Sequence, residues 1–153
     1  MKSVVVLPGE GRFIAVGSSD VGVTVKAAGA ETGGLCTVWE GQIGPGSVGA
    51  GAHYHRKRDE FIYVLEGELV LRVGQESHTA RTGTFAFVPR ETIHAFHNAS
   101  SDNATVLIMH HPAGFEQFLE EMQQLIRQQG SKEERVALAE RFDMINVPAS
   151  VTT

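Results

Sequence analysis

Short apolar runs separated by turn residues fill residues 13–110 and restrict the folds open to this chain. Glycine, proline, serine, aspartate or asparagine lies between consecutive runs, as is typical of strands joined by tight turns. The runs that we expect to form strands are 21–25, 35–43, 61–65, 69–73, 84–88, 93–98 and 105–109. No helical pattern interrupts them, so we expect antiparallel strands that close into a barrel or jelly roll, because closure removes exposed strand edges. The predicted fold class is mainly β.

The periodicity becomes helical after Pro112. Apolar side chains recur there at spacings of three and four, which predicts an amphipathic helix that ends at Gly130; they are Phe115, Phe118, Leu119, Met122, Leu125 and Ile126. Ser131 and Glu134 form a capping box, which predicts a second helix through about Phe142. We expect residues 1–111 to form the barrel and residues 112–153 a helical extension of the same domain, packed on the outside of the barrel. The alternative is a helix that binds a partner.

Residues of metal-ligand type occur in two separated clusters. His53, His55 and Glu60 lie in one stretch, and His94 follows more than thirty residues later. Side chains two apart on an extended strand share a face, so His53 and His55 point the same way while Tyr54 points away. Brought together, three imidazoles and one carboxylate would bind a divalent transition metal and leave coordination positions free for a small molecule.

The sequence around these ligands resembles both conserved motifs of the cupins. Residues 53–67 read HYHRKRDEFIYVLEG and residues 83–98 read GTFAFVPRETIHAFHN. The resemblance implies a cupin double-stranded β-helix, which is a jelly-roll barrel, followed here by two C-terminal α-helices. It also implies one divalent transition metal per chain, bound by His53, His55, Glu60 and His94.

Two positions depart from the cupin pattern. Ser47, between Gly46 and Gly49, stands where the first motif is often preceded by a glycine. Glu91 stands where the second motif often has a glycine. Because a side chain disfavours a positive φ angle, Glu91 puts the local turn conformation in question, although it changes no ligand.

Small single-domain cupins with this ligand set and a helical tail resemble quercetin (flavonol) dioxygenases. The resemblance implies an oxygenase for a small aromatic or enolic substrate, in which Glu60 is also the catalytic group that accepts the substrate's hydroxyl proton. Iron, manganese, nickel, cobalt or copper would permit oxygenation, and zinc only Lewis-acid chemistry. Two other classes stay open: a metal-dependent isomerase, cyclase or decarboxylase that uses no dioxygen, and a non-catalytic protein that binds a small molecule.

Strand alternation predicts the residues around the metal. Ile62 and Val64 share the face of Glu60, and Phe96 shares the face of His94. We therefore expect Ile62, Val64 and Phe96 to line an apolar substrate pocket, which suits an aromatic ligand better than a sugar.

The opposite face of the strand 61–65 is also apolar. Phe61, Tyr63 and Leu65 alternate with the pocket residues and point away from the cavity. An exposed face of this kind needs a cover, so we expect a homodimer formed through barrel strands. The terminal helices are the alternative cover.

The remaining polar signals are weaker. His97 is out of phase with His94 and faces away, His78 lies in a polar hairpin segment, and one of His110 and His111 must point inward. The basic residues 56–58 are typical of a solvated loop, or they draw an anionic substrate to the barrel mouth.

Composition limits the partners and the location. The formal net charge is −5 and the pI is near 5.8, so the chain lacks the excess of basic residues typical of nucleic-acid-binding proteins. We therefore expect no nucleic-acid partner. No apolar run approaches the ~18 residues that span a membrane, and the run at 4–7 is too short for a signal peptide. The single cysteine, Cys36, fits a reducing compartment, and we expect a cytoplasmic protein.

Overall fold

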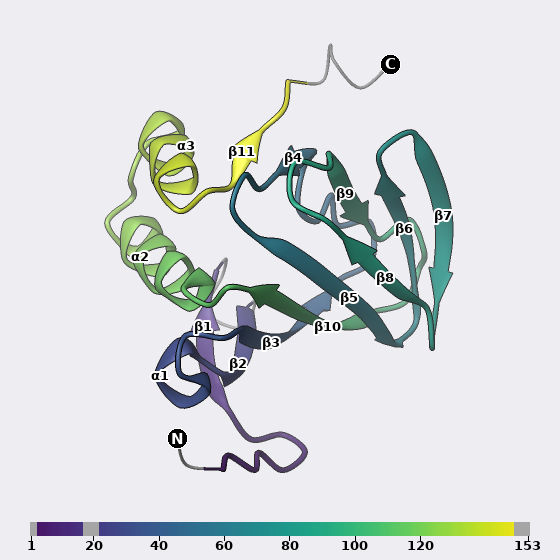
Figure 1. The fold of residues 1–153 in the computed structure, drawn as a ribbon. Helices are drawn as coiled ribbons and strands as arrows, with labels where there is room; N and C mark the ends of the chain where they lie inside the picture. The colour runs from purple at the N-terminus through teal and green to yellow at the C-terminus, as the bar shows by residue number, and fades with distance from the viewer. Residues whose placement is uncertain (1–2, 17–21, 149–153) are drawn as a thin grey trace.

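The computed structural model describes residues 3–16 and 22–148 as a β-rich body flanked by two helices (Figure 1). Its elements are β1 (Arg12–Ala15), β2 (Gly22–Ala27), α1 (Gly29–Thr32), β3 (Thr37–Ile43), β4 (His53–Tyr54), β5 (Asp59–Glu66), β6 (Glu68–Val73), β7 (Glu76–Arg81), β8 (Phe85–Val88), β9 (His94–His97), β10 (Ala104–His111), α2 (Phe115–Arg127), α3 (Lys132–Arg141) and β11 (Ile145–Asn146).

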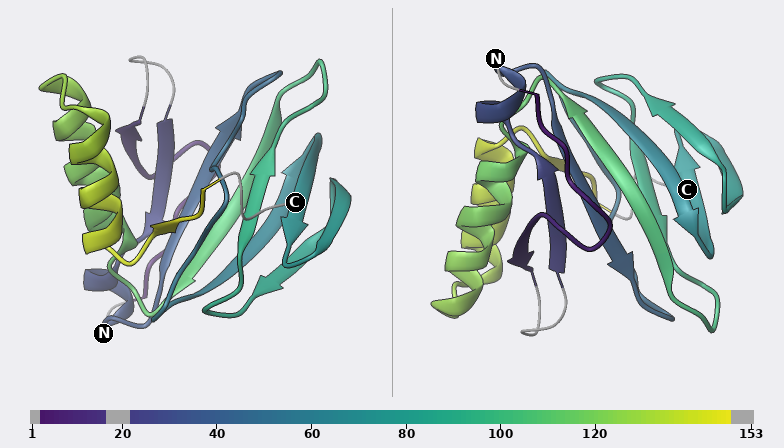
Figure 2. Two further views of the ribbon diagram at one scale, coloured as in Figure 1. Left: turned by 90° about the horizontal axis from the view of Figure 1, so that it is seen from above. Right: turned by 90° about the horizontal axis from the view of Figure 1, so that it is seen from below.

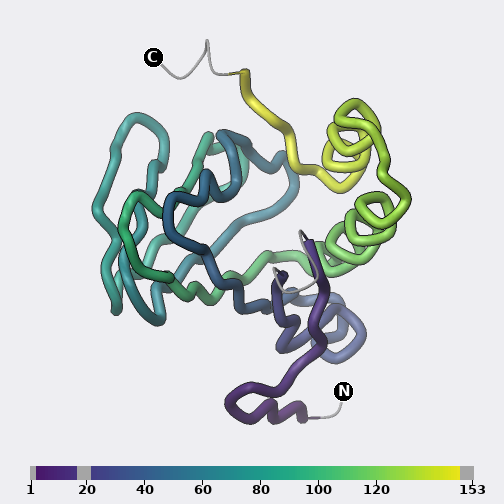
Figure 3. Tube along the Cα trace, turned by 180° about the vertical axis from the view of Figure 1, so that it is seen from behind, coloured from purple at the N-terminus to yellow at the C-terminus, as the bar shows by residue number. Residues whose placement is uncertain are grey.

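The strands form two antiparallel sheets, as the turn spacing predicted. One sheet has the order β1-β2-β3-β10-β5-β8 and the other the order β11-β4-β9-β6-β7. Figure 3 shows the teal β6–β7 hairpin on the side of the molecule opposite the green and yellow helices. The fold is therefore mainly β and consistent with the predicted cupin jelly roll.

The core lies between the two sheets and follows from strand alternation. On β10, Ala104, Val106, Ile108 and His110 are buried, and the residues between them are partly exposed. Facing residues of the other sheet, such as Leu71, are also buried. Side chains of a strand alternate between faces, so β10 gives half of its residues to this core.

The two C-terminal helices bridge the sheets at the edges formed by β1 and β11. Helix α2 contacts β1, where Arg12 pairs with Glu120, and α3 contacts β11 (Figure 2). Ser131 caps α3, accepting from the backbone N–H of Glu134 at 3.1 Å, which confirms the capping box. The apolar stripe of α2 faces inward, where Phe115, Phe118 and Leu119 line a cavity of the barrel.

A buried carboxylate fixes the start of α2. Glu116 accepts hydrogen bonds from the backbone N–H groups of Gly29 and Gly114, each at 2.9 Å, and from the hydroxyl of Thr37. Burial opposes the ionisation of Glu116, but these donors outweigh it and hold its pKa below the ordinary value. The beginning of α2 is thereby tied to α1 and to β3.

Four elements differ from the expected strands and helices, and the first is β1, which lies before the first expected strand. The polar hairpin segment around His78 is a regular strand, β7, in which His78 is exposed. The short helix α1 and the strand β11 have no clear signal in the sequence. Val21, the first residue of the expected strand 21–25, lies outside the described residues, as do residues 149–153 of the helical extension.

No helix in the described ranges 3–16 and 22–148 is long and apolar enough to cross a membrane.

Candidate metal centre

The four predicted ligands meet inside the barrel, although they come from both sheets. His53 on β4 and His94 on β9 are register partners in one sheet. Glu60 lies on β5 of the other sheet, and His55 follows β4 directly. All four side chains are buried, and one ligand atom from each lies within 4.8 Å of the others. This places them to bind one metal ion.

Hydrogen bonds fix the orientation of the three histidine rings. The Nδ1 atoms of His53, His55 and His94 face the backbone carbonyl oxygens of Gly51, Asp143 and Thr92, at 2.7, 2.7 and 3.0 Å. A carbonyl oxygen can only accept, so each Nδ1 carries a proton and each neutral ring keeps a lone pair on Nε2. Metal-binding histidines in proteins are commonly held in this way.

The arrangement of the Nε2 atoms fits a divalent cation. His55 Nε2 is buried and finds no hydrogen-bond partner among the described residues, although Glu60 Oε2 lies 3.3 Å away. His94 Nε2 lies 2.9 Å from the same oxygen. Imidazole lone pairs that converge on a carboxylate repel it unless a cation lies between them, because each group is an acceptor. Nitrogen and carboxylate ligands suit a divalent transition metal.

At His53 and Glu60, the electrostatics of the site favour the protonation states that bind a metal, which are a neutral imidazole and an ionised carboxylate. Burial, together with the nearby His94, lowers the pKa of His53 to about 4, so His53 is neutral at physiological pH. Burial also opposes the charged form of Glu60, but the surrounding imidazoles, His110 first among them, hold its pKa well below the ordinary value. Burial opposes protonation of His94, yet its contact with Glu60 raises its pKa. A bound cation would take the place of that extra proton.

An apolar cavity of about 350 Å³ reaches the centre from the side of α2. Its polar lining includes His53, Glu60 and His110. Its apolar lining comes from both the barrel and the helix and includes Trp39, Phe96, Phe115, Phe118, Leu119, Met122 and Met144. The stripe of α2 is therefore a wall of this cavity, and the volume lies at the lower end of the range of small-molecule sites.

The expected pocket residues occupy two different places. Phe96 lines the cavity, whereas Ile62 and Val64 are 1% exposed and belong to the core between the sheets. Both share the inward face of β5 with Glu60, but they lie further along the strand than the cavity reaches. Alternation gives the face of a residue and not its depth along the barrel.

His110 is also part of the site, and its alternation with His111 predicted that one of the two points inward. It is the register partner of Glu60, and its Nε2 atom lies 3.4 Å from Glu60 Oε2. Alternation along β10 required either His110 or His111 to point inward, and His110 does so. His97 is exposed, as its phase on β9 predicted.

The segment after α3 completes the surroundings of His55. The Asp143 carbonyl oxygen faces His55 Nδ1, and its carboxylate accepts from the backbone N–H groups of Arg56 and Lys57 at 3.0 and 2.8 Å. The side chains of Arg56 and Lys57 are exposed, whereas the guanidinium of Arg58 lies over the Phe115 ring at 5.9 Å. The basic loop is thus held by the C-terminal extension.

The two departures from the cupin pattern are accommodated by the backbone. Glu91 adopts φ +66°, the conformation that a glycine would favour, and its N–H donates to the His55 carbonyl at 2.6 Å. Gly49 has φ +56°, and a Cβ there would lie 2.1 Å from the carbonyl oxygen of Phe96. The requirement for glycine near the start of the first motif is therefore met at Gly49, two residues after Ser47.

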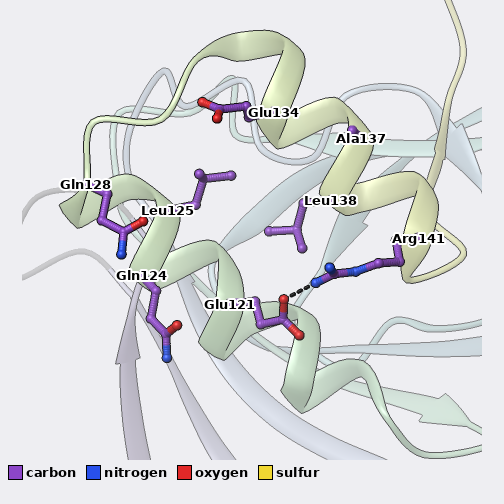
Figure 4. Close-up of a pocket in the computed structure, with 8 residues that line it drawn as sticks. All are labelled: Glu121, Gln124, Leu125, Gln128, Glu134, Ala137, Leu138 and Arg141. Atoms are coloured by element: carbon purple, nitrogen blue, oxygen red, sulfur yellow. Dashed lines mark hydrogen bonds and ion pairs between the residues drawn. The ribbon is translucent and has the colours of Figure 1, made fainter.

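A separate hollow lies between α2 and α3, away from the metal ligands (Figure 4). Leu125 and Leu138 lie on facing sides of it, and Arg141 of α3 pairs with Glu121 of α2. No histidine or cysteine lines it. Its features are those of a contact between two packed helices.

The barrel is similar to known proteins in both sequence and fold. Residues 39–110 match the sequence model of the Cupin domain family. The structure is similar to that of KdgF from a Halomonas species, with a TM-score of 0.63 and 18% identity over 75% of this chain and 99% of that one. It is also similar to a predicted oxalate decarboxylase from Thermotoga maritima, with a TM-score of 0.63 and 19% identity over 71% of this chain and 99% of that one.

A third solved structure has a higher identity over a shorter region. A sugar phosphate isomerase of the cupin superfamily from Silicibacter pomeroyi is 30% identical, with a TM-score of 0.51, over 58% of this chain and 59% of that one. No curated protein sequence matches the chain. The first two similarities concern the fold alone, because their identities are low.

Proposed function

We propose that this chain, whose residues 39–110 match the Cupin domain family, is a metal-dependent oxygenase for a small aromatic or enolic substrate. One observation carries the proposal: an apolar cavity walled by Trp39, Phe96 and Phe115 opens onto His53 and Glu60. Aromatic walls favour a flat apolar ligand, and the few polar groups favour one that has only one or two oxygens to place.

The protein residues have separate parts in this proposal. His53, His55, Glu60 and His94 hold one divalent transition metal, which supplies Lewis acidity and, for iron, manganese, nickel, cobalt or copper, access to oxygen chemistry. The Glu60 carboxylate accepts the proton of the substrate hydroxyl, since it lines the cavity and its lowered pKa keeps it ionised. The apolar wall packs against the substrate ring and excludes water.

A metal-dependent isomerase is the second candidate. It is favoured by the 30% identity to the sugar phosphate isomerase of Silicibacter pomeroyi. In that case Glu60 moves a proton within the substrate, and no dioxygen is consumed. A cyclase or decarboxylase would need the same centre. The cavity wall argues against a free sugar, because it offers hydroxyl groups few partners.

We also propose that the protein acts as a homodimer in the cytoplasm. Tyr63 and Leu65 on β5 are exposed at 40% and 38%, and Phe85 and Phe87 on β8 at 60% and 49%. Phe61 joins this set, with its ring 4.9 Å from that of Phe87. The helices cannot cover this face, since α2 and α3 contact β1 and β11 instead. Because β8 is also an edge strand, a second copy of the chain could cover the apolar face and the open edge together.

Turnover with and without dioxygen separates the two enzymatic candidates. Protein loaded with iron, manganese, nickel, cobalt, copper or zinc is incubated with a panel of flavonols, catechols, enediols and sugar phosphates in air and under nitrogen. We expect consumption of phenolic or enolic compounds only in air, with dioxygen uptake, and loss of the reaction in Glu60→Gln but not in His97→Gln. Equal turnover under nitrogen would establish the isomerase class, and tight binding without turnover would establish a binding protein.

A further inference from the structure

His110 lies against the candidate metal centre and differs from the four ligands in its contacts. It is 1% exposed, and its ring stacks on Phe115 with a centroid distance of 3.8 Å. Its Nε2 atom lies 3.4 Å from Glu60 Oε2, and it lines the same cavity as Glu60. Unlike the four candidate ligands, it is not part of the group whose ligand atoms all lie within 4.8 Å of one another.

The contact of Trp39 with His110 Nδ1 decides whether His110 Nε2 is a metal ligand or a hydrogen-bond donor. The indole Nε1–H of Trp39 donates to His110 Nδ1 at 3.3 Å, and an indole N–H can only donate. Nδ1 of His110 must therefore hold a lone pair, and a neutral ring then carries its proton on Nε2. The three ligand histidines show the opposite pattern, because carbonyl oxygens face their Nδ1 atoms.

We infer that His110 is a positioning residue, held by Trp39 in the Nε2–H tautomer, which donates a hydrogen bond to Glu60 and does not bind the metal. The hydrogen bond restricts rotation of the Glu60 carboxylate. Its Oε2 atom therefore stays in the orientation in which it faces the ligand histidines. This deepens the proposed function and rests on the same metal centre.

The tautomers can be measured directly. Long-range proton–nitrogen NMR correlation on ¹⁵N-labelled, zinc-loaded protein distinguishes a protonated Nδ1 from a protonated Nε2 and from a metal-bound nitrogen. We expect Nδ1–H with zinc-bound Nε2 for His53, His55 and His94, and Nε2–H with no metal signature for His110. A zinc-bound or Nδ1-protonated His110 overturns the inference. The tautomer of His110 can also be measured in the metal-free protein. A failure to bind zinc would therefore contradict the proposed function, while the His110 signals would still test the inference.

Substitution of Trp39 tests the cause of the tautomer. Trp39→Phe keeps a buried aromatic ring and removes the Nε1–H donor. We expect the His110 signals of this variant to shift toward a mixture of both tautomers. An unchanged pure Nε2–H tautomer would show that Trp39 does not hold it and would overturn that part of the inference.

Substitutions of His110 test its action on the centre through cobalt affinity. His110→Phe keeps the stacking on Phe115 and removes the donor, and we expect it to weaken cobalt binding by about 10- to 100-fold. His110→Gln offers an amide donor of similar reach and should recover part of the loss. His97→Phe, at an exposed histidine, is the control. A His110→Phe variant with unaltered affinity, or a His110→Gln variant as weak as His110→Phe, would contradict the role as a donor.

Discussion

His53 on β4 and His94 on β9 are register partners whose ring centroids lie 4.2 Å apart inside the barrel. Both rings turn Nδ1 toward a backbone carbonyl, so both point an Nε2 lone pair at the same space. Two buried acceptors at this distance need a shared cation or an added proton. The proposed function and the role of His110 therefore both depend on metal binding.

We therefore expect one divalent transition metal per chain. His94→Ala should sharply lower metal occupancy and leave the barrel folded, because the other ligands and the core remain. Elemental analysis gives the occupancy, and thermal unfolding with added metal salts gives the stabilisation that binding to the folded state must produce. His97→Ala, at an exposed histidine on the same strand, should behave as the parent protein. Absence of metal, together with no thermal stabilisation by any of the salts, would contradict the prediction.

The cavity wall predicts the effect of removing an aromatic ring. Phe96 is 5% exposed and lines the cavity beside His53 and Glu60. Phe96→Ala should weaken the binding of a flavonol by about 1 to 3 kcal/mol through lost aromatic contact, without displacing the metal. Calorimetric titration of cobalt-loaded protein measures this, with Phe87→Ala on the outer face as the control. Unaltered flavonol affinity, or tight binding of a free sugar, would show that the cavity has another ligand.

The exposed aromatic face predicts the oligomeric state. We expect a dimer by light scattering at micromolar concentration, and a monomer for Phe85→Asp, because a charge in the centre of the face opposes its burial. Phe13→Asp introduces the same charge at another exposed phenylalanine, on β1, and should leave the dimer intact. A monomeric parent protein would rule out the interface.

The carboxylate at the start of α2 predicts a stability that depends on pH. Glu116→Gln should lower the free energy of unfolding by about 1 to 3 kcal/mol near neutral pH, since one carboxylate there accepts hydrogen bonds from Gly29, Thr37 and Gly114. The folded-state pKa of Glu116 is lowered, so its contribution is complete above the ordinary value of 4.5 and is lost as the pH falls below it.

Urea unfolding of the two proteins between pH 3 and pH 7 checks this, with Glu140→Gln at an exposed site of α3 as the control. The difference between the parent protein and Glu116→Gln should shrink toward acid pH. A difference that is constant with pH, or that grows toward acid pH, would contradict the assigned role of the carboxylate.

Much of the centre could be predicted from the sequence because its ligands lie on strands with a fixed side-chain period. His53 and His55 are two residues apart, and the phase of His94 also placed Phe96 inward and His97 outward. Within one strand, alternation fixes the face of each residue regardless of the rest of the fold.

What could not be predicted depends on which strands and segments become neighbours. His110 enters the site because β10 pairs with β5 in the register that opposes it to Glu60, and Trp39 reaches His110 because β3 lies on the other side of β10. Asp143 holds His55 from a segment that follows α3, 88 residues away. The periodicity of residues 115–126 correctly predicted an amphipathic helix. It did not predict that the apolar face of α2 lines a cavity, because periodicity does not specify the surface against which a helix packs.

Anomalous diffraction from a crystal of the protein with bound cobalt locates the metal independently of activity. We expect a single strong peak per chain at the cobalt edge, within bonding distance of Nε2 of His53, His55 and His94 and of a carboxylate oxygen of Glu60, with His110 outside the coordination sphere. A peak elsewhere, or no peak at this position in a cobalt-saturated crystal, would contradict this expectation.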